Sequence, residues 1–168
     1  MNSSHLKKIV ARNQRGVSLI EVLVTLAILA GGLLGTAGLM LYSMKLNKSS
    51  EFRTQAVYAA SDLFERIEAN KEAANAGSYA VALGNTVGTV GTNCVATKCS
   101  AAALANFDLS AWETTVATTL PLATWSVTRT AVGPPSDYTI VINWTDRSSI
   151  KTNSGENFAY TASKTIGN

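Results

Sequence analysis

The chain begins with an apolar segment that contains almost no charge. From Val17 to Tyr42 its only charged residue is Glu21. As a helix this segment would be roughly 39 Å long at 1.5 Å per residue, whereas the hydrocarbon core of a bilayer is about 30 Å thick. The pattern therefore predicts a helix that can span a membrane.

Residues 51–72 show the period of an amphipathic helix. No proline occurs between Met1 and Leu120, so the apolar segment and this one are predicted to form a single helix from about Val17 to Ala74. Asp62 and Arg66 are four residues apart, and we interpret them as an ion pair on a solvated face. The apolar positions predicted to face a core are Phe52, Ala56, Ala59, Leu63 and Ile67.

Residues 75–99 are rich in Gly, Thr, Asn and Ala and have no sustained period, which predicts a loop with at most one short strand. Ser100 then precedes a helical pattern that ends at Pro121, and its hydroxyl is suited to cap that helix. The residues expected on one side of this helix are Leu104, Phe107, Ala111 and Val116.

The period changes to two in the C-terminal third. Alternating aromatic and β-branched residues predict strands at 125–130 and 138–145, and 158–162 indicates a third. Residues 133–137 supply the first turn and 146–157 a polar loop. A small antiparallel sheet packed on the amphipathic helix gives an α+β fold.

Charge is concentrated before the apolar segment. Without Lys7, Lys8, Arg12 and Arg15, four of its 14 Lys and Arg residues, the chain has 10 basic against 11 acidic residues. A nearly neutral remainder is not expected to carry a nucleic-acid surface. The positive-inside rule places residues 1–16 in the cytoplasm and the residues after Lys45 across the membrane.

Histidine and cysteine usage limits the chemistry. The single histidine, His5, lies in the N-terminal segment, so a chain that lost this segment would have no imidazole for catalysis or metal binding. Cys94 and Cys99 have no further ligand partners, so no metal site is expected. Outside the inner membrane they can form a disulfide, which we favour over free thiols.

The residues Gln14-Arg15-Gly16-Val17-Ser18-Leu19-Ile20-Glu21-Val22-Leu23 resemble the prepilin motif of type IV pilins and type II secretion pseudopilins. The resemblance implies that a prepilin peptidase cleaves between Gly16 and Val17 and methylates the new amine of Val17. It also implies that Glu21 pairs with the N-terminal amine of a neighbouring subunit. The family most often has Phe where this chain has Val17.

Two features of the apolar segment have alternative interpretations. From the residues alone, Glu21 is either an interfacial carboxylate in the first turn or a buried acid that awaits a cation. Gly31 and Gly35 have GxxxG spacing, which indicates close helix packing. Together with Gly32 and Gly38 they equally indicate local helix melting during assembly.

The predicted order of long helix, loop and antiparallel sheet is similar to the pilin fold. Residues 99–105, 107–109 and 140–144 and Trp112 look more loosely like the PilV family of minor pilins. A major pilin usually has a cysteine pair that brackets its C-terminal region, and this chain has none. The resemblance implies a cleaved leader at 1–16, a transmembrane and assembly helix at 17–44, and a periplasmic head at 45–168.

The sequence thus predicts a minor pilin without a cofactor, located in the bacterial inner membrane and then in the pilus at the cell surface. Its expected partners are a prepilin peptidase and the major and minor pilins of a hetero-oligomeric fibre. A minor pseudopilin shares every N-terminal feature, and a tip subunit for adhesion or DNA uptake would use the loops at 75–99 or 146–157. An enzyme is not expected, because no pair of carboxylates has a diagnostic spacing among Asp108, Glu113, Asp137, Asp146 and Glu156.

Overall fold

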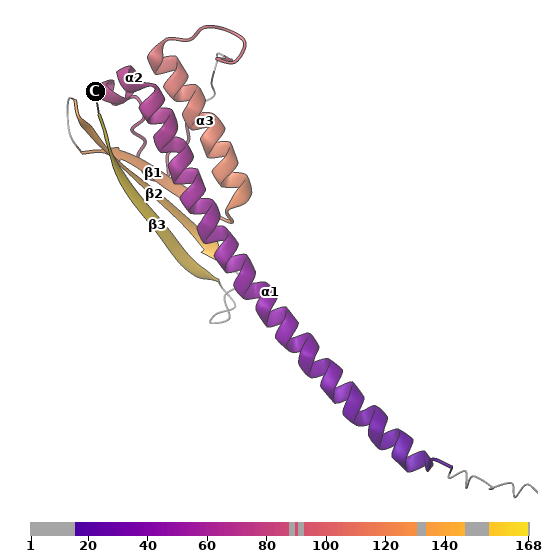
Figure 1. Ribbon diagram of the computed structural model, residues 1–168. Helices are drawn as coiled ribbons and strands as arrows, with labels where there is room; N and C mark the ends of the chain where they lie inside the picture. Colours follow the sequence, from indigo (N-terminus) through magenta and orange to yellow (C-terminus); the bar gives the residue numbers. More distant parts are fainter. Residues whose placement is uncertain (1–15, 88–89, 91–92, 131–133, 147–154, 168) are drawn as a thin grey trace, which may run out of the picture. The chain divides into compact units, whose positions relative to one another are not determined.

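The structure is a computed structural model that describes residues 16–87, 90, 93–130, 134–146 and 155–167 (Figure 1). Along the chain it contains α1 (Leu19–Ala69), α2 (Lys71–Ala76), α3 (Ala101–Thr119), β1 (Thr124–Arg129), β2 (Ser136–Asp146) and β3 (Glu156–Ile166). The chain divides into two compact units, 1–42 and 43–168. The predicted α+β class, with one long helix and a small antiparallel sheet, is confirmed. We call residues 43–168 the head.

The first unit contains the N-terminal part of α1. The helix is unbroken through the four glycines of the apolar segment, and every described residue up to Tyr42 is exposed. The prediction that one helix continues to Ala74 is wrong, because α1 ends at Ala69 and Asn70 leaves the helical conformation with φ −116° and ψ 60°.

The short α2 ends in a Schellman motif. The amide of Ser78 donates to the carbonyl of Ala73 at 2.9 Å, and the amide of Gly77 donates to Ala74 at 3.0 Å. Gly77 has φ +82°, and a Cβ at this position would lie 3.2 Å from Nη1 of Arg129. Both the left-handed backbone and the close approach of Arg129 therefore require glycine here.

The helix α3 begins and ends where the sequence predicts. The Ser100 hydroxyl accepts a hydrogen bond from the amide of Ala103 at 3.3 Å, and the helix ends before Leu120 and Pro121. Its buried face differs from the prediction, since of the four residues expected there only Val116 is buried. The other apolar residues buried on α3 are Ala105, Leu109 and Trp112.

The three strands form an antiparallel sheet in the order β1-β2-β3. The register sets Trp125 opposite Ile142, and Ile142 opposite Tyr160. Along β2 every second residue is buried, as the period-two pattern predicts. One strand-like contact within the predicted loop at 75–99 is also present, because Val81 pairs with Val127 at the outer edge of β1.

Within the head, α1 and α3 contact the sheet at different strands. Arg53 on α1 lies over the ring of Phe158 on β3, with its guanidinium carbon 4.9 Å from the ring centroid. On α3, Trp112 packs edge-on against Trp125 of β1 with ring centroids 6.0 Å apart. The predicted stripe on α1 is confirmed, since Ala56, Leu63 and Ile67 are fully buried and Phe52 and Ala59 pack against the core.

Candidate functional site

The predicted cleavage position lies just before α1. Gly16 and Val17 are exposed and not helical, so the peptide bond between them is accessible. The preceding basic residues of the predicted leader, 1–15, lie outside the described residues.

Glu21 lies in the first turn of α1. Its backbone amide donates to the carbonyl of Ser18 at 3.0 Å. The helix begins at Leu19, two residues after Val17. A carboxylate in the first turn faces the positive end of the helix dipole. In the described first unit it is also the only charged residue.

The apolar part of α1 has the length and composition of a membrane-spanning helix, and none of its most apolar stretch is buried. The hydroxyls of its two threonines bond within the helix. Thr25 donates to the carbonyl of Val22 at 2.8 Å, and Thr36 donates to Leu33 at 2.9 Å. These bonds satisfy the two threonine hydroxyls in a lipid environment.

The four glycines of this segment have open surroundings. A Cβ added at Gly31, Gly32, Gly35 or Gly38 would meet no atom within 4 Å outside the local helix backbone. Close packing at these positions would thus require a helix from another chain. Both the packing and the melting interpretations remain predictions.

The predicted disulfide is present. Cys94 and Cys99 are joined with a Cα–Cα distance of 5.5 Å. The enclosed turn is held by Asn93, whose carbonyl accepts from the amides of Ala96 and Thr97, each at 3.1 Å. Since Cys99 directly precedes the cap of α3, the disulfide ties the end of the loop to the start of that helix.

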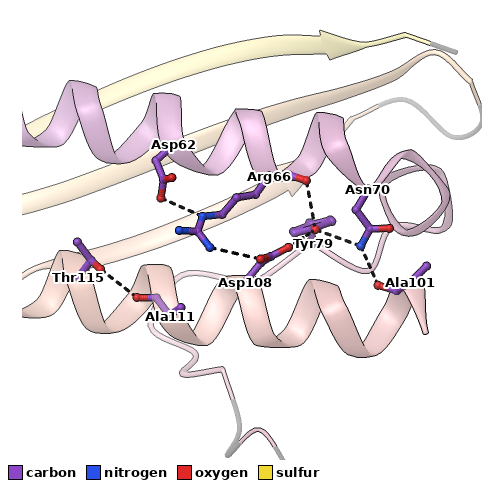
Figure 2. Close-up of polar contacts among 8 residues, drawn as sticks. All are labelled: Asp62, Arg66, Asn70, Tyr79, Ala101, Asp108, Ala111 and Thr115. Carbon is purple, nitrogen blue, oxygen red and sulfur yellow. Dashed lines mark hydrogen bonds and ion pairs between the residues drawn. The ribbon is translucent and has the colours of Figure 1, made fainter. Parts of the chain in front are cut away.

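The head contains a polar network between α1 and α3 (Figure 2). Arg66 on α1 bonds to Oδ2 of Asp62 at 3.0 Å and to Oδ1 of Asp108 at 3.3 Å. The interpretation of the Asp62–Arg66 pair as a solvated face is therefore incomplete, because Arg66 also bridges to a carboxylate on α3 whose side chain is only 12% exposed.

The network continues through the segment that follows α2. The hydroxyl of Tyr79, which is fully buried, donates to Oδ2 of Asp108 at 2.7 Å and accepts from Nδ2 of Asn70 at 3.2 Å. Asn70 also donates to the carbonyl of Ala101 at 2.8 Å. The network thus connects the end of α1, the segment after α2 and the first half of α3 (Figure 2).

The environment shifts the pKa of two members of this network. Burial raises the pKa of Tyr79 well above its usual value, and its hydrogen bond to Asp108 raises it further. Burial alone would lower the pKa of Arg66, but the hydrogen bond and charge of Asp62 and the charge of Asp108 raise it. Tyr79 therefore stays neutral and Arg66 stays charged, so the arrangement is a fixed structural connection between the helices.

The carboxylates considered for an enzyme do not form a common site. Asp108 is occupied by Tyr79 and Arg66, and Glu113 accepts the amide of Val87 at 2.8 Å. Asp137 accepts a hydrogen bond from the hydroxyl of Thr165. Asp146 and Glu156 occupy opposite positions in the register of β2 and β3, at the C-terminal end of β2. Among the described residues, no three His, Cys, Asp or Glu side chains come together as metal ligands.

Sequence reasoning missed the roles of Asn70, Tyr79 and Asp108. By sequence pattern, Asp108 is one of five carboxylates without a diagnostic spacing, and Tyr79 lies in a predicted loop without a sustained period. The helix pattern around Asp108 could have indicated burial, because Ala105, Leu109 and Trp112 surround it at helical spacing on the buried face.

Comparison with known families gives two matches. Residues 38–110 match the family described as type IV pilin Tt1218, and residues 11–37 match the prokaryotic N-terminal methylation motif. The first match contains the whole polar network, and the second contains Gly16, Val17 and Glu21. No curated protein and no solved structure matches the chain significantly.

Proposed function

We propose that this chain is a minor pilin, a structural subunit used in the assembly, initiation or modification of a type IV pilus. The premise is that the two family matches support assignment of the chain to the type IV pilins. Type IV pilins are structural subunits and not enzymes. A prepilin methylation motif implies processing by a prepilin peptidase, membrane anchoring and assembly with other pilins.

The observation that carries the proposal is the position of Glu21. It is the one charge on the apolar, exposed part of α1 up to Tyr42, and it lies in the first turn after an accessible Gly16–Val17 bond. A carboxylate in a spanning helix costs roughly 2.5–3.5 kcal/mol at the centre and less near an end. Neutralisation by a cation of another subunit would offset this cost.

In the proposed mechanism, cleavage after Gly16 creates the amine that provides this cation. The peptidase methylates the amine of Val17, and the helix enters the fibre in the register where Glu21 meets the N-terminal amine of a neighbouring subunit. In any other register the carboxylate would lack a partner. The glycines at 31, 32, 35 and 38 would allow the helix to pack closely or to melt locally as it leaves the membrane.

Two features favour a minor subunit over a major pilin. The disulfide between Cys94 and Cys99 closes a turn before α3 and does not bracket the C-terminal region. Val17 also replaces the Phe that the family most often has. Both fit the looser resemblance to PilV-type minor pilins.

The test is the intact mass and N-terminal sequence of the chain expressed with and without a prepilin peptidase. We expect a product that begins at methylated Val17 only when the peptidase is active. A chain that keeps Met1 in the presence of active peptidase would contradict the proposal. Gly16→Ala, which changes the residue before the cut, should block processing, and Gly38→Ala, a glycine substitution outside the motif, should not.

A minor pseudopilin of a type II secretion system shares this processing. The two roles differ in the fibre that contains the mature chain. Deletion of the chain should reduce the number of surface pili if it is a minor pilin. If deletion instead abolishes secretion of folded exoproteins and leaves pili unchanged, the pseudopilin role is correct.

A further inference from the structure

The two edges of the sheet are not equivalent. At the β1 edge, Val81 and Val127 exchange backbone hydrogen bonds of 2.8 and 2.9 Å, so this edge is closed at its centre. In the part of the chain that the structure describes, no segment forms backbone hydrogen bonds with the outer edge of β3. That strand is 11 residues long, while β1 has six.

The register identifies which backbone groups of β3 point outward. Thr130 donates to the carbonyl of Asp137 at 2.9 Å, so the odd-numbered residues of β2 bond toward β1 and the even-numbered ones toward β3. Their partners on β3 are the even-numbered residues Phe158 to Lys164. The outward amides and carbonyls therefore belong to Asn157, Ala159, Thr161, Ser163 and Thr165.

This edge lacks the features that usually protect an exposed strand. Residues 157–163 contain no charge, no proline and no glycine, and aromatic or small side chains alternate along them. Exposed edges are ordinarily protected by lysine, proline, a bulge or a covering segment. The first charged residue after this stretch, Lys164, pairs with Glu68 of α1. The edge thus has the chemistry of a site that accepts an extended strand.

We propose that the outer edge of β3, from Asn157 to Thr165, binds an extended strand of a different pilin-type subunit and continues the sheet across the subunit interface. This inference rests on the proposed function, which places the chain among other pilins. The outward row of backbone donors and acceptors supplies the affinity, and the uncharged stretch selects a partner strand that is likewise uncharged at its centre.

A second copy of the chain fits this edge poorly. Arg53 contacts Phe158, and Glu68, which follows Arg53 on α1, contacts Lys164, which follows Phe158 on β3. The head part of α1 and β3 therefore run in the same direction. Antiparallel pairing of two β3 strands would point the head parts of the two α1 helices in opposite directions. In the proposed fibre the subunits share one polarity, and two heads that face opposite ways do not fit it.

Parallel pairing of two copies in register is also unfavourable. It would set the outward amide and carbonyl of a residue directly opposite those of the same residue in the other copy. In a parallel ladder the bonding residues of the two strands are instead staggered by one position. The β1 edge of a second copy is closed by Val81. A strand from a different subunit has none of these restrictions.

The experiment uses the full-length chain in cells that assemble the fibre, with two substitutions at the exposed edge residue Thr161. Thr161→Pro removes one outward amide without loss of a bond to β2, and Thr161→Lys adds a charge at the edge. The matched controls are Thr161→Val, which keeps the amide, and Val141→Lys, which adds the same charge at the residue opposite Thr161 on the central strand.

We expect both edge substitutions to reduce recovery of the chain in sheared fibres at least tenfold, while both controls match the unsubstituted chain. Tryptophan fluorescence and membrane levels report whether each variant is folded. If Thr161→Pro fails to fold, Thr161→Lys decides the outcome. Equal recovery of the folded edge variants and the unsubstituted chain would overturn the inference.

A photoreactive residue at Ser163 identifies the occupant. Crosslinking to a strand of a different pilin-type subunit supports the inference, whereas crosslinking to a second copy, to a protein of another class or to nothing overturns it. Recovery of the unsubstituted chain separates the two proposals. If the unsubstituted chain is absent from the fibre, the proposed function and the inference that rests on it are both contradicted. If the unsubstituted chain is present and the folded edge variants are recovered equally well, the edge inference alone is contradicted.

Discussion

The hydroxyl of Tyr79 lies 2.7 Å from Oδ2 of Asp108 and donates a hydrogen bond to it. The two residues are far apart in the sequence. Tyr79 lies in the segment predicted as a loop, and Asp108 lies on the helix α3. Their bond holds the segment after α2 against α3, and Arg66 holds the other oxygen of the same carboxylate from α1. The stability of the head should therefore depend on this carboxylate having both partners.

Tyr79→Phe should destabilise the head by about 1–3 kcal/mol, because it leaves a largely buried carboxylate with one partner fewer. The measurement is denaturant unfolding of the detergent-solubilised full-length chain, followed by tryptophan fluorescence. All three tryptophans lie in the head, so the signal is independent of the apolar segment. Tyr58→Phe removes a hydroxyl from a tyrosine that is 70% exposed and should have almost no effect. Equal effects of the two substitutions would contradict a role for the network.

The head should lose stability at alkaline pH. Burial raises the pKa of both Tyr79 and Tyr138 in the folded state above the unfolded value of about 10. A raised pKa means that the stabilisation is complete below pH 10 and is lost as the pH rises through the folded pKa values. Thermal unfolding between pH 8 and 11 should show this loss, and Tyr79→Phe should reduce its slope. An unchanged slope would show that Tyr79 does not contribute.

Gly77→Ala should destabilise the head by roughly 1–2 kcal/mol. The backbone at this position has φ +82°, which costs about that much for a residue with a Cβ, and the new methyl would also lie 3.2 Å from Arg129. Gly38→Ala is the matched control, since a Cβ there meets nothing within 4 Å. Comparison of their melting temperatures tests the prediction, and a Gly77→Ala chain as stable as the control would refute it.

Replacement of Cys94 and Cys99 together by Ser should lower the free energy of unfolding by about 2 kcal/mol, as expected for closure of so short a loop. The unsubstituted chain treated with a reductant should lose the same amount. Non-reducing mass mapping of envelope-derived protein provides a direct check. Two free thiols in that protein would contradict the disulfide.

Glu21→Ala should leave insertion and cleavage largely intact but impair incorporation into fibres, because the helix would lose the charge that selects its register. The measurement is the ratio of mature chain in sheared fibres to mature chain in membranes. Glu51→Ala, which removes an exposed carboxylate from the head part of α1, is the control. Normal incorporation of the Glu21→Ala chain would eliminate the pairing role.

The sequence predicted those elements whose local pattern is decisive. Strict alternation located β2, Ser100 and Pro121 bounded α3, and the apolar segment indicated a helix that can span a membrane. Local pattern did not reveal the break at Asn70. Its side chain bonds to Tyr79 and to the carbonyl of Ala101, and these partners come from segments that only the tertiary fold brings together.

The buried face of α3 failed as a prediction for a related reason. The pattern at Leu104, Phe107 and Ala111 is as apolar as the true face, and intrinsic periodicity cannot choose between two adjacent faces of an alanine-rich helix. The choice is made by Trp112, whose indole nitrogen donates to the carbonyl of Ala59 at 2.7 Å and whose ring packs on Trp125. The candidate N-terminal site, by contrast, could be proposed from the sequence because its residues lie close together in the chain.

The exposed apolar surface of α1 up to Tyr42 has a consequence for the energetics of assembly in the proposed role. Its side chains would be surrounded by lipid before assembly and by neighbouring helices afterwards, so the hydrophobic effect contributes nearly equally to both states. Transfer between them is close to an exchange of one apolar solvent for another. The direction of that exchange would then depend on the few groups that distinguish the two surroundings, namely one carboxylate, four glycines and the contacts made by the head.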